Sequence, residues 1–287
     1  MKVLVTGVSG QLGYDVVKTL QNRKIEYMGT DRTQLDVTNA KQTRDIISKY
    51  APDLVIHCGA YTAVDKAEED IETCTRVNID GTKNIAIACK EVNAKMVYMS
   101  TDYVFSGDGK IAFEETDQPM PINVYGRSKL GGEEEVMRLL DRYFILRTSW
   151  VFGSYGNNFI KTMIRMGKEN SQVNVVADQI GSPTYTADLS SLLCDMIETD
   201  RYGIYHVTNE GFCSWADLAE KVFELANLQV KVNRISSEDY PARALRPKNS
   251  RLSKKSLDAQ GFKRLPAWEN ALERMMKELV NRQECGG

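Results

Sequence analysis

The sequence predicts an α/β protein: a Rossmann-type, doubly wound parallel sheet followed by a smaller C-terminal α/β domain. Short apolar, β-branched runs alternate with segments of helical periodicity through the first half of the 287 residues. This alternation is typical of a parallel sheet with helices on both faces. A glycine-rich turn follows the first apolar run, at the end of the strands where such sheets bind ligands. We expect residues 1–150 to form the sheet domain and residues 151–287 mainly the second domain, with some segments returning to the first.

The elements follow from these patterns in chain order. Five apolar runs predict the strands of the sheet, which are Lys2–Thr6, Ile25–Met28, Asp53–Cys58, Lys95–Ser100 and Tyr143–Arg147. Helical spacing of apolar residues predicts the intervening helices, which are the segment after Gly13, Ala40–Tyr50, Thr73–Val92 and Tyr125–Asp141. The alternation loosens after Trp150, where we predict helices at Trp215–Asn227 and Ala267–Asn281 and a basic, proline-punctuated loop at Arg243–Leu252.

The composition excludes several function classes. The 37 basic and 39 acidic residues give a net charge of −2, so we expect neither a nucleic-acid partner nor binding to an anionic membrane. The six cysteines form no C-x-x-C pair, which favours reduced core thiols over a metal cluster or a disulfide framework. No apolar run reaches the ~20 residues of a membrane helix, and a strand rather than a signal peptide begins at Lys2. We therefore expect a cytoplasmic protein without a metal site.

The glycine-rich turn predicts a dinucleotide site. Residues 6–13 read T-G-V-S-G-Q-L-G, between a strand and a helix. Glycine permits a tight turn and a close approach of the backbone to a pyrophosphate. The helix N-terminus adds free N–H groups and the positive end of a dipole. The G-x-x-G-x-x-G spacing resembles that of extended short-chain dehydrogenases/reductases. The residues expected at the cofactor here are Gly7, Gly10, Gln11, Leu12 and Gly13.

Further cofactor contacts are expected where later strands end. Asp31 lies 18 residues after Gly13, near the position of an acid that binds the ribose of NADH, although a solvated acidic turn would look the same. Arg32 would instead meet the 2′-phosphate of NADPH, so the sequence leaves NADPH or NADH open. The other expected contacts are Asp36 and Val37 near the adenine and Gly59, Ala60 and Tyr61 after the third strand.

Tyr125 and Lys129 form a Y-x-x-x-K pair, which places both side chains on one face of a helix. A free tyrosine has a pKa of ~10, and a nearby ammonium group lowers the pKa of the phenol. The same lysine can hold the nicotinamide ribose, so we expect both residues at that end of the cofactor. Thr101 follows a strand, where its hydroxyl can bind a carbonyl oxygen. These residues predict hydride transfer to a carbonyl carbon, with Tyr125 as the proton donor.

Eight stretches, in order along nearly the whole chain, carry a family resemblance. They are T-G-V-S-G-Q-L-G (6–13), T-A-V-D-K-A-E (62–68), S-T-D-Y-V-F (100–105), N-V-Y-G-R-S-K (123–129), R-T-S-W-V-F (147–152), G-N-N-F (156–159), D-Q-I-G-S-P-T (178–184) and R-P-K-N-S-R-L (246–252). Through them the chain resembles the dTDP-4-dehydrorhamnose reductases. The resemblance implies reduction of the 4-keto group of dTDP-4-dehydro-L-rhamnose to dTDP-L-rhamnose, the last step of dTDP-rhamnose biosynthesis, and a C-terminal domain that binds the dTDP-sugar.

The resemblance also implies roles for individual residues. The catalytic roles fall on Thr101, Tyr125 and Lys129. The sugar nucleotide would contact Asp102, Trp150, Asn158, Arg246 and Arg251. For the last three the alternative is a capped turn at 158 and a solvated basic loop at 246–251.

At two positions the sequence differs from related enzymes, and these differences bear on the expected reaction and on the expected dimer. Related sugar-nucleotide dehydratases carry a glutamate after the aspartate, whereas Tyr103 stands here, which favours reduction over elimination of water. Some relatives use a glutamate in the first helix for a magnesium-bridged dimer, whereas this chain has Asp15. A homodimer therefore stays open, and a metal link between subunits is not expected.

Two other functions share this fold. One is a related nucleotide-sugar epimerase or reductase, which a thermal-shift comparison of dTDP-, UDP- and GDP-sugars would identify. The other is a non-catalytic NAD(P)-binding subunit resembling the regulatory subunit of methionine adenosyltransferase. The intact Thr101, Tyr125 and Lys129 disfavour this second alternative.

Overall fold

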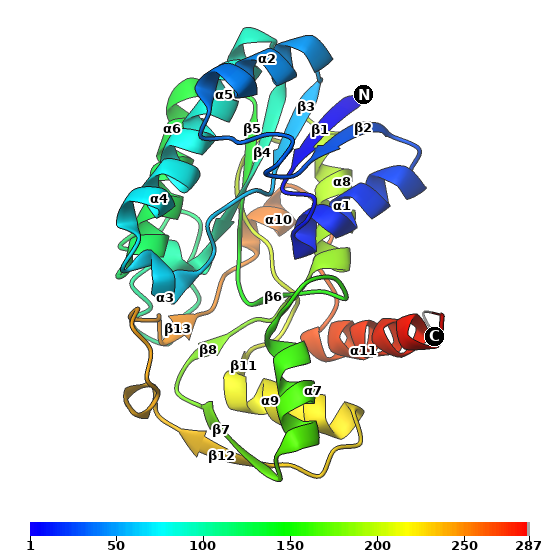
Figure 1. The fold of residues 1–287 in the computed structure, drawn as a ribbon. Coiled ribbons are helices and arrows are strands. Elements are labelled where there is room, and N and C mark those ends of the chain that lie inside the picture. Colours follow the sequence, from blue (N-terminus) through cyan, green and yellow to red (C-terminus); the bar gives the residue numbers. More distant parts are fainter. Residues whose placement is uncertain (286–287) are drawn as a thin grey trace.

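A six-stranded parallel sheet forms the centre of the larger part of the molecule (Figure 1). The computed structural model describes the backbone of residues 1–285 and the side chains of residues 1–281. In spatial order the strands are β10 (Gly203–His206), β5 (Tyr143–Thr148), β4 (Lys95–Thr101), β3 (Leu54–His57), β1 (Lys2–Thr6) and β2 (Glu26–Thr30). The strand order reverses between β1 and β3, and α/β sheets bind ligands at the carboxyl ends of strands at such a point.

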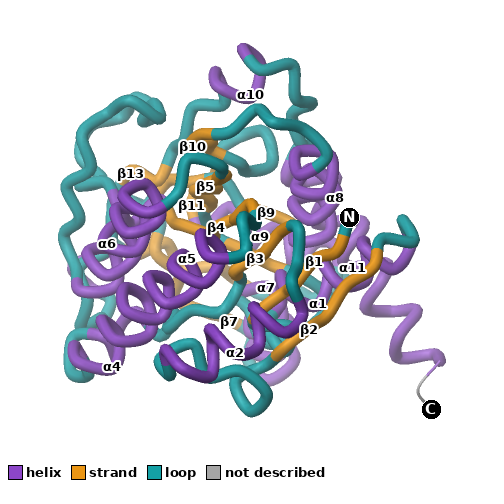
Figure 2. The backbone as a smooth tube through the Cα atoms, turned by 90° about the horizontal axis from the view of Figure 1, so that it is seen from above, coloured by secondary structure: helices purple, strands orange, loops and turns teal. Residues whose placement is uncertain are grey.

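Two apolar layers cover the sheet, because successive side chains of a strand point to opposite faces. Val3 and Val5 face one layer and Leu4 faces the other. The first layer contains α1 (Gln11–Asn22) and α8 (Thr186–Ile197), and the second contains α2 (Ala40–Tyr50), α5 (Gly81–Glu91) and α6 (Val124–Leu139). Figure 2 shows the strands between these two groups of helices. The predicted doubly wound α/β class is confirmed.

Two predicted elements differ from the structure for clear reasons. The strand predicted at Ile25–Met28 extends through Thr30, because the pairing with β1 continues to its last residue. The helix predicted over Thr73–Val92 consists of α4 (Ile71–Thr75), a π-helical turn (Arg76–Asp80) and α5. Within the π-helical turn Asn78 is buried and makes hydrogen bonds that a uniform apolar face would not predict.

The smaller part has its own apolar core. The sequence predicted two of its helices but not its strands, because the alternation of strand and helix patterns loosens after Trp150. Three helices pack there, which are α7 (Phe159–Glu169), α9 (Trp215–Leu225) and α11 (Trp268–Cys285). Its strands pair as β7 (Gln172–Val176) with β12 (Lys231–Ile235), β6 (Val151–Phe152) with β9 (Thr184–Tyr185), and β8 (Ile180–Gly181) with β11 (Cys213–Ser214) and β13 (Asn249–Ser250). Two short helices lie in connections, α3 (Val64–Ala67) and α10 (Lys255–Ala259).

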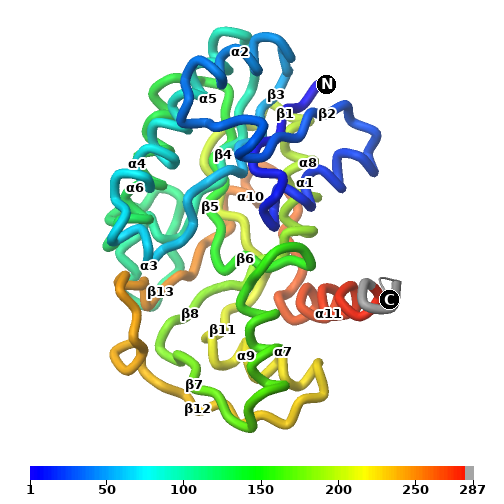
Figure 3. The backbone as a smooth tube through the Cα atoms, viewed as in Figure 1, coloured from blue at the N-terminus to red at the C-terminus, as the bar shows by residue number. Residues whose placement is uncertain are grey.

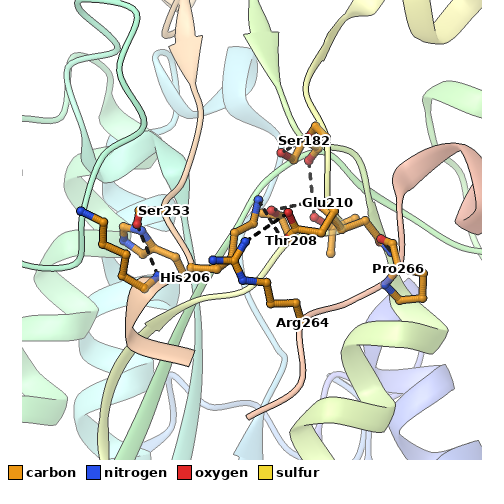
Figure 4. Close-up of polar contacts among 12 residues, drawn as sticks. Ser182, His206, Thr208, Glu210, Ser253, Arg264 and Pro266 are labelled. Carbon is orange, nitrogen blue, oxygen red and sulfur yellow. Dashed lines mark hydrogen bonds and ion pairs between the residues drawn. The ribbon is translucent and has the colours of Figure 1, made fainter. Parts of the chain in front are cut away.

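The loop after β10 joins the two parts (Figure 4). The backbone N–H of Glu210 donates to the carbonyl of Pro266 at 3.0 Å, and the guanidinium of Arg264 lies 3.4 Å from the Glu210 carboxylate. The Ser182 hydroxyl donates to the carbonyl of Gly211 at 2.7 Å. These contacts hold the smaller part against the carboxyl end of the sheet. Among the described helices, none combines the length and apolar character needed to cross a membrane.

Candidate active site

The glycine loop between β1 and α1 packs too closely for side chains. Gly7 has a φ of +73°, and a Cβ there would lie 2.6 Å from the amide nitrogen of Gly59. A Cβ on Gly13 would lie 2.2 Å from the carbonyl oxygen of Gly7. Gly10 caps α1 without a side-chain hydrogen bond, and the first turn of α1 contains no acidic side chain. The loop thus presents a positive helix end without a competing carboxylate of its own, which fits a dinucleotide pyrophosphate.

Asn158 lies against this loop. Its Nδ2 donates to Oε1 of Gln11 at 2.9 Å and to the carbonyl of Gly153 at 2.8 Å. Its Oδ1 accepts the backbone N–H of Lys161 at 3.1 Å and so caps α7. The side chain of Leu12, in the first turn of α1, packs against the sheet core. The amide of Asn158 is therefore engaged in capping and in joining α7 to the glycine loop, and its geometry favours the capped turn over contact with a sugar nucleotide.

Asp31 and Asp36, after β2, each accept hydrogen bonds within a tight turn. Oδ1 of Asp31 accepts the N–H of Thr33 at 2.8 Å and its hydroxyl at 2.7 Å. Oδ1 of Asp36 accepts the N–H of Thr38 at 3.0 Å and its hydroxyl at 2.8 Å. These hydrogen bonds hold the pKa of both carboxyl groups below the ordinary value, and the charge of Arg32 adds to the effect on Asp36. Both carboxylates are therefore ionised and fixed in place at neutral pH.

Residues 59–61 follow β3 and are held by Asn78, which sequence reasoning missed. Oδ1 of Asn78 accepts the N–H of Tyr61 at 2.8 Å, and its Nδ2 donates to the Tyr61 carbonyl at 3.1 Å and to Oγ of Ser128 at 2.8 Å. Asn78 thus links the segment after β3 to the helix that carries Tyr125. Its signal in the sequence is only a polar residue within an apolar helical run. Nearby, Val37 packs against Gly81, where a Cβ would lie 2.7 Å from Cγ2 of Val37.

The structure brings Tyr125 close to Thr101 at the end of β4, and Lys129 lies one helical turn beyond Tyr125 on α6. Asn123 caps α6, and its Oδ1 accepts the N–H of Gly126 at 2.7 Å. This start places Tyr125 and Lys129 one helical turn apart. Thr101 is the last residue of β4, and its hydroxyl lies close enough to the Tyr125 phenol to favour the phenolate. The arrangement provides a phenol and a second hydroxyl at one point, which is what protonation of a carbonyl oxygen requires.

The electrostatics of the pair differ from the prediction. Burial, together with the charge of Asp102, raises the pKa of Tyr125 above its ordinary value. Burial lowers the pKa of Lys129 to about 7, and its Nζ lies 4.1 Å from the centre of the Tyr98 ring. The pKa of Tyr125 is therefore raised in this structure and not lowered as predicted, because burial is the largest effect on the phenol. A raised pKa keeps the phenol protonated at neutral pH, which is the state that a proton donor needs.

Asp102 is buried directly beside these groups. Burial raises the pKa of its carboxyl group to about 6, although the nearby side chains of Ser250 and Thr101 favour the charged form and lower the pKa in part. Its Oδ2 is buried without a hydrogen-bond partner. Oγ1 of Thr101 lies 3.1 Å from Oδ1 of Asp102. The next residue, Tyr103, contacts Tyr125 edge to face with ring centres 5.7 Å apart. Position 103 therefore supplies an aromatic wall to the site and no second carboxylate.

A buried ion pair between β5 and α6 lies next to the residues of the site. Arg147 on β5 donates to both carboxylate oxygens of Glu133, at 2.9 Å and 2.6 Å, and both side chains are almost fully buried. The hydroxyl of Ser100, which precedes Thr101, donates to the same carboxylate at 2.5 Å. Glu133 lies one helical turn beyond Lys129. Sequence reasoning missed this network, although an arginine inside the apolar run Y-F-I-L-R is a signal of a buried partner.

The remaining predicted substrate residues lie on the smaller part and the loop that follows β12. Trp150 has a φ of +48° and stacks on Trp215 with ring centres 3.7 Å apart. Arg251 donates to Oδ1 of Asn249 at 2.9 Å, and its guanidinium lies 5.7 Å from the centre of the Phe212 ring. Arg246 is bound by a carboxylate of α3, a contact that is described below.

Histidine, cysteine and acidic side chains form no obvious metal centre in the described part of the chain, where no group of three could hold an ion. Nδ1 of His57 lies 2.7 Å from Oγ1 of Thr6, and burial lowers the pKa of this imidazole to about 3, which fits a structural role. Asp15 is buried and accepts a hydrogen bond from Thr186 of α8. The free cysteines are Cys58, Cys74, Cys89, Cys194 and Cys213, and the side chain of Cys285 lies outside the described residues.

Comparison with known proteins assigns the family. Residues 1–281 match the family described as RmlD substrate binding domain. A curated dTDP-4-dehydrorhamnose reductase of Aggregatibacter actinomycetemcomitans is 41% identical over 286 residues, which cover 95% of this chain and 97% of that protein. The crystal structure of dTDP-4-dehydrorhamnose reductase from Bacillus anthracis in complex with NADP matches with a TM-score of 0.95 and 46% identity, over 96% of this chain and 99% of that one.

A second solved structure agrees with these matches. The dTDP-4-dehydrorhamnose reductase ortholog from Clostridium acetobutylicum has a TM-score of 0.96 and 40% identity, over 98% of this chain and 100% of that one. These matches extend over nearly the whole chain and therefore include both parts of the fold. The chain belongs to the RmlD substrate binding domain family.

Proposed function

We propose that this protein reduces the 4-keto group of dTDP-4-dehydro-L-rhamnose to give dTDP-L-rhamnose, with NADPH or NADH as the reductant. The observation that carries the proposal is that Thr101, at the end of β4, lies beside the Tyr125 phenol, with Lys129 one helical turn further along α6. Relatives named dTDP-4-dehydrorhamnose reductase, similar over nearly their whole length, support the choice of substrate.

In this proposal the chain's own residues bind and protonate the C4 carbonyl oxygen of the substrate. The bound reductant supplies a hydride to the C4 carbonyl carbon. Tyr125 donates its phenolic proton to the carbonyl oxygen as that oxygen gains charge, and Thr101 hydrogen-bonds the same oxygen. Lys129 lies one helical turn beyond Tyr125, where it can hold the nicotinamide ribose of a bound cofactor, and burial lowers its pKa to about 7. The carbonyl becomes a secondary alcohol, and no carboxylate at position 103 is available for elimination of water.

We propose that the cofactor and the sugar nucleotide bind to different parts of the protein. The cofactor lies along the glycine loop and the ends of β2 and β3, and the complex of the Bacillus anthracis relative with NADP supports the exposed Arg32 as a 2′-phosphate contact. The sugar nucleotide lies between Tyr125 and the smaller part, with contacts to Asp102, Trp150 and Arg251. The sheet domain and the substrate domain are then divided near residue 150, and β10 and α8 return to the first. A cytoplasmic location and a homodimer stay predictions.

The test is turnover of the dTDP-keto-sugar by the purified protein with NADPH and NADH in parallel. We expect oxidation of one or both cofactors that depends on the keto sugar, with formation of dTDP-L-rhamnose. UDP- and GDP-keto-sugars serve as comparison substrates. Turnover restricted to a UDP- or GDP-sugar would instead indicate a related nucleotide-sugar enzyme, and no turnover with any keto sugar would favour a non-catalytic subunit.

A further inference from the structure

The loop between β12 and β13 crosses back toward the sheet beside α3, as the orange segment in Figure 3 shows. We call residues 240–248 of this loop the strap. Ala244 is buried, whereas the side chain of Leu245 is 71% exposed. The strap leads directly into β13, where the side chain of Ser250 lies close enough to the buried carboxyl group of Asp102 to favour its charged form. A shift of the strap would therefore reach the residues beside Thr101.

One carboxylate on α3 holds the strap through four hydrogen bonds. Oδ1 of Asp65 accepts the backbone N–H groups of Arg243 and Ala244, each at 3.1 Å. Arg246 donates to Oδ1 at 3.1 Å and to Oδ2 at 2.6 Å, in a two-pronged ion pair. These hydrogen bonds lower the pKa of the Asp65 carboxyl group, so it is ionised at neutral pH. Asp65 belongs to the T-A-V-D-K-A-E stretch, to which the proposed reaction gives no role.

The same short segment also holds the start of the catalytic helix. Oε1 of Glu68 accepts the backbone N–H of Val124 at 2.8 Å, one residue before Tyr125. The capping residue Asn123 uses its Nδ2 to donate to the strap carbonyl of Leu245 at 2.7 Å. Ala67 is buried in an apolar cluster with Val124 and Tyr125. The strap and the proton donor are thus positioned by one set of contacts around α3.

These contacts suggest a different role for Arg246 from the one the family resemblance implied. Both terminal nitrogens of its guanidinium are bound to Asp65. A cation already paired in this way attracts a diphosphate weakly, because the carboxylate repels the anion. Its geometry instead resembles that of an anchor between two segments far apart in the chain.

We propose that Asp65 is a positioning residue, which anchors the strap through Arg246 and so sets the affinity of the site for the sugar nucleotide. Arg246 is then an anchor and not a phosphate ligand. This inference rests on the proposed function, since it concerns the same substrate. The two roles of Arg246 predict opposite effects of removing the Asp65 charge. If Arg246 binds phosphate, its release from Asp65 should strengthen binding of the sugar nucleotide. If Arg246 anchors the strap, the same change should loosen the strap and weaken binding.

A double-mutant cycle of Asp65→Asn, Arg246→Gln and the double variant tests the proposal. With the keto sugar as the varied substrate, we expect each single change to raise KM about tenfold, the effect of one charge-assisted hydrogen-bonded pair. We expect kcat and the KM for the reduced cofactor to stay within about threefold, and the double variant to be no worse than the worse single variant. Asp65→Glu, which keeps the charge, should recover part of the loss.

Two outcomes would overturn the proposal. One is a KM that falls or stays unchanged in Asp65→Asn. The other is an Arg246→Gln effect of full size in the Asp65→Asn background, which would mark Arg246 as a direct ligand. The matched control is Asp258→Asn, because Asp258 makes a similar two-pronged ion pair with Arg264, at 2.9 Å and 2.5 Å, outside the site. It should leave every kinetic constant unchanged.

Amide hydrogen exchange tests the anchor without any substrate. We expect the N–H groups of Arg243 and Ala244 to exchange several-fold faster in Asp65→Asn than in the wild type, and unchanged in Asp258→Asn. Unchanged exchange at the strap would refute the anchor even if the kinetic effects were present. Absence of wild-type turnover would refute the proposed function and leave the exchange experiment as the test of the strap.

Discussion

The Glu133–Arg147 pair predicts a large and specific loss of stability. Replacing Glu133 by leucine leaves the Arg147 guanidinium, 2% exposed, without a counter-charge and removes the acceptor of Ser100. Breaking a buried pair from one side destabilises a protein by about 3–5 kcal/mol. For a chain of this size that corresponds to a fall in Tm of roughly 6–20 °C. Urea unfolding and a thermal melt at neutral pH measure the change.

The double variant Glu133→Leu/Arg147→Met separates the ion pair from its packing. Since the unpaired charge causes most of the loss, we expect the double variant to regain most of the wild-type stability. The exposed pair of Arg44 and Glu91 is the matched control, and Glu91→Gln should change stability by at most about 1 kcal/mol. A Glu133→Leu protein as stable as the wild type, or a double variant no better than the single, would refute the reasoning.

Two further predictions concern the cofactor loop and the buried lysine. Gly13→Ala should weaken cofactor binding roughly tenfold or more in calorimetry, because its Cβ would meet the Gly7 carbonyl at 2.2 Å, whereas Gly109→Ala, with open space around its Cβ, should not. The folded-state pKa of Lys129 is lowered to about 7 from 10.5, so the unfolded chain binds more protons between these values. The free energy of unfolding of the wild type, relative to that of Lys129→Met, should therefore rise between pH 7 and about pH 10. A difference between the two proteins that stays constant with pH in urea unfolding would contradict this prediction.

The sequence predicted the sheet well because local patterns determine it. The runs at Lys2–Thr6 and Tyr143–Arg147 lie within buried strands, and Asn39 caps the helix predicted at Ala40–Tyr50. The arrangement of Tyr125 and Lys129, the proposed catalytic pair, was predictable for the same reason, since their spacing alone puts them on one helix face. The edge strand β10 was not predicted, because its four residues are recognisable only by their pairing with β5.

Long-range contacts explain what the sequence could not predict. Asn78 is polar within an apolar helical run, and its role depends on Tyr61 and Ser128, which approach only in the folded chain. Arg246 looked like a cation available to a phosphate until its contact with Asp65, 181 positions away, was seen. The raised pKa of Tyr125 also depends on burial, which the spacing of Tyr125 and Lys129 does not reveal. Local pattern therefore predicted where the chemistry lies, and packing determined its electrostatics.

The most direct test of the central claim compares the wild type, Tyr125→Phe and Tyr143→Phe in the reduction of dTDP-4-dehydro-L-rhamnose. Tyr143 begins β5, at the opposite end of the sheet from Thr101, and serves as the matched control. We predict keto-sugar-dependent cofactor oxidation by the wild type and Tyr143→Phe, and a fall in kcat of roughly 10²–10⁴-fold in Tyr125→Phe with cofactor binding retained. Wild-type turnover in Tyr125→Phe would contradict Tyr125 as the proton donor.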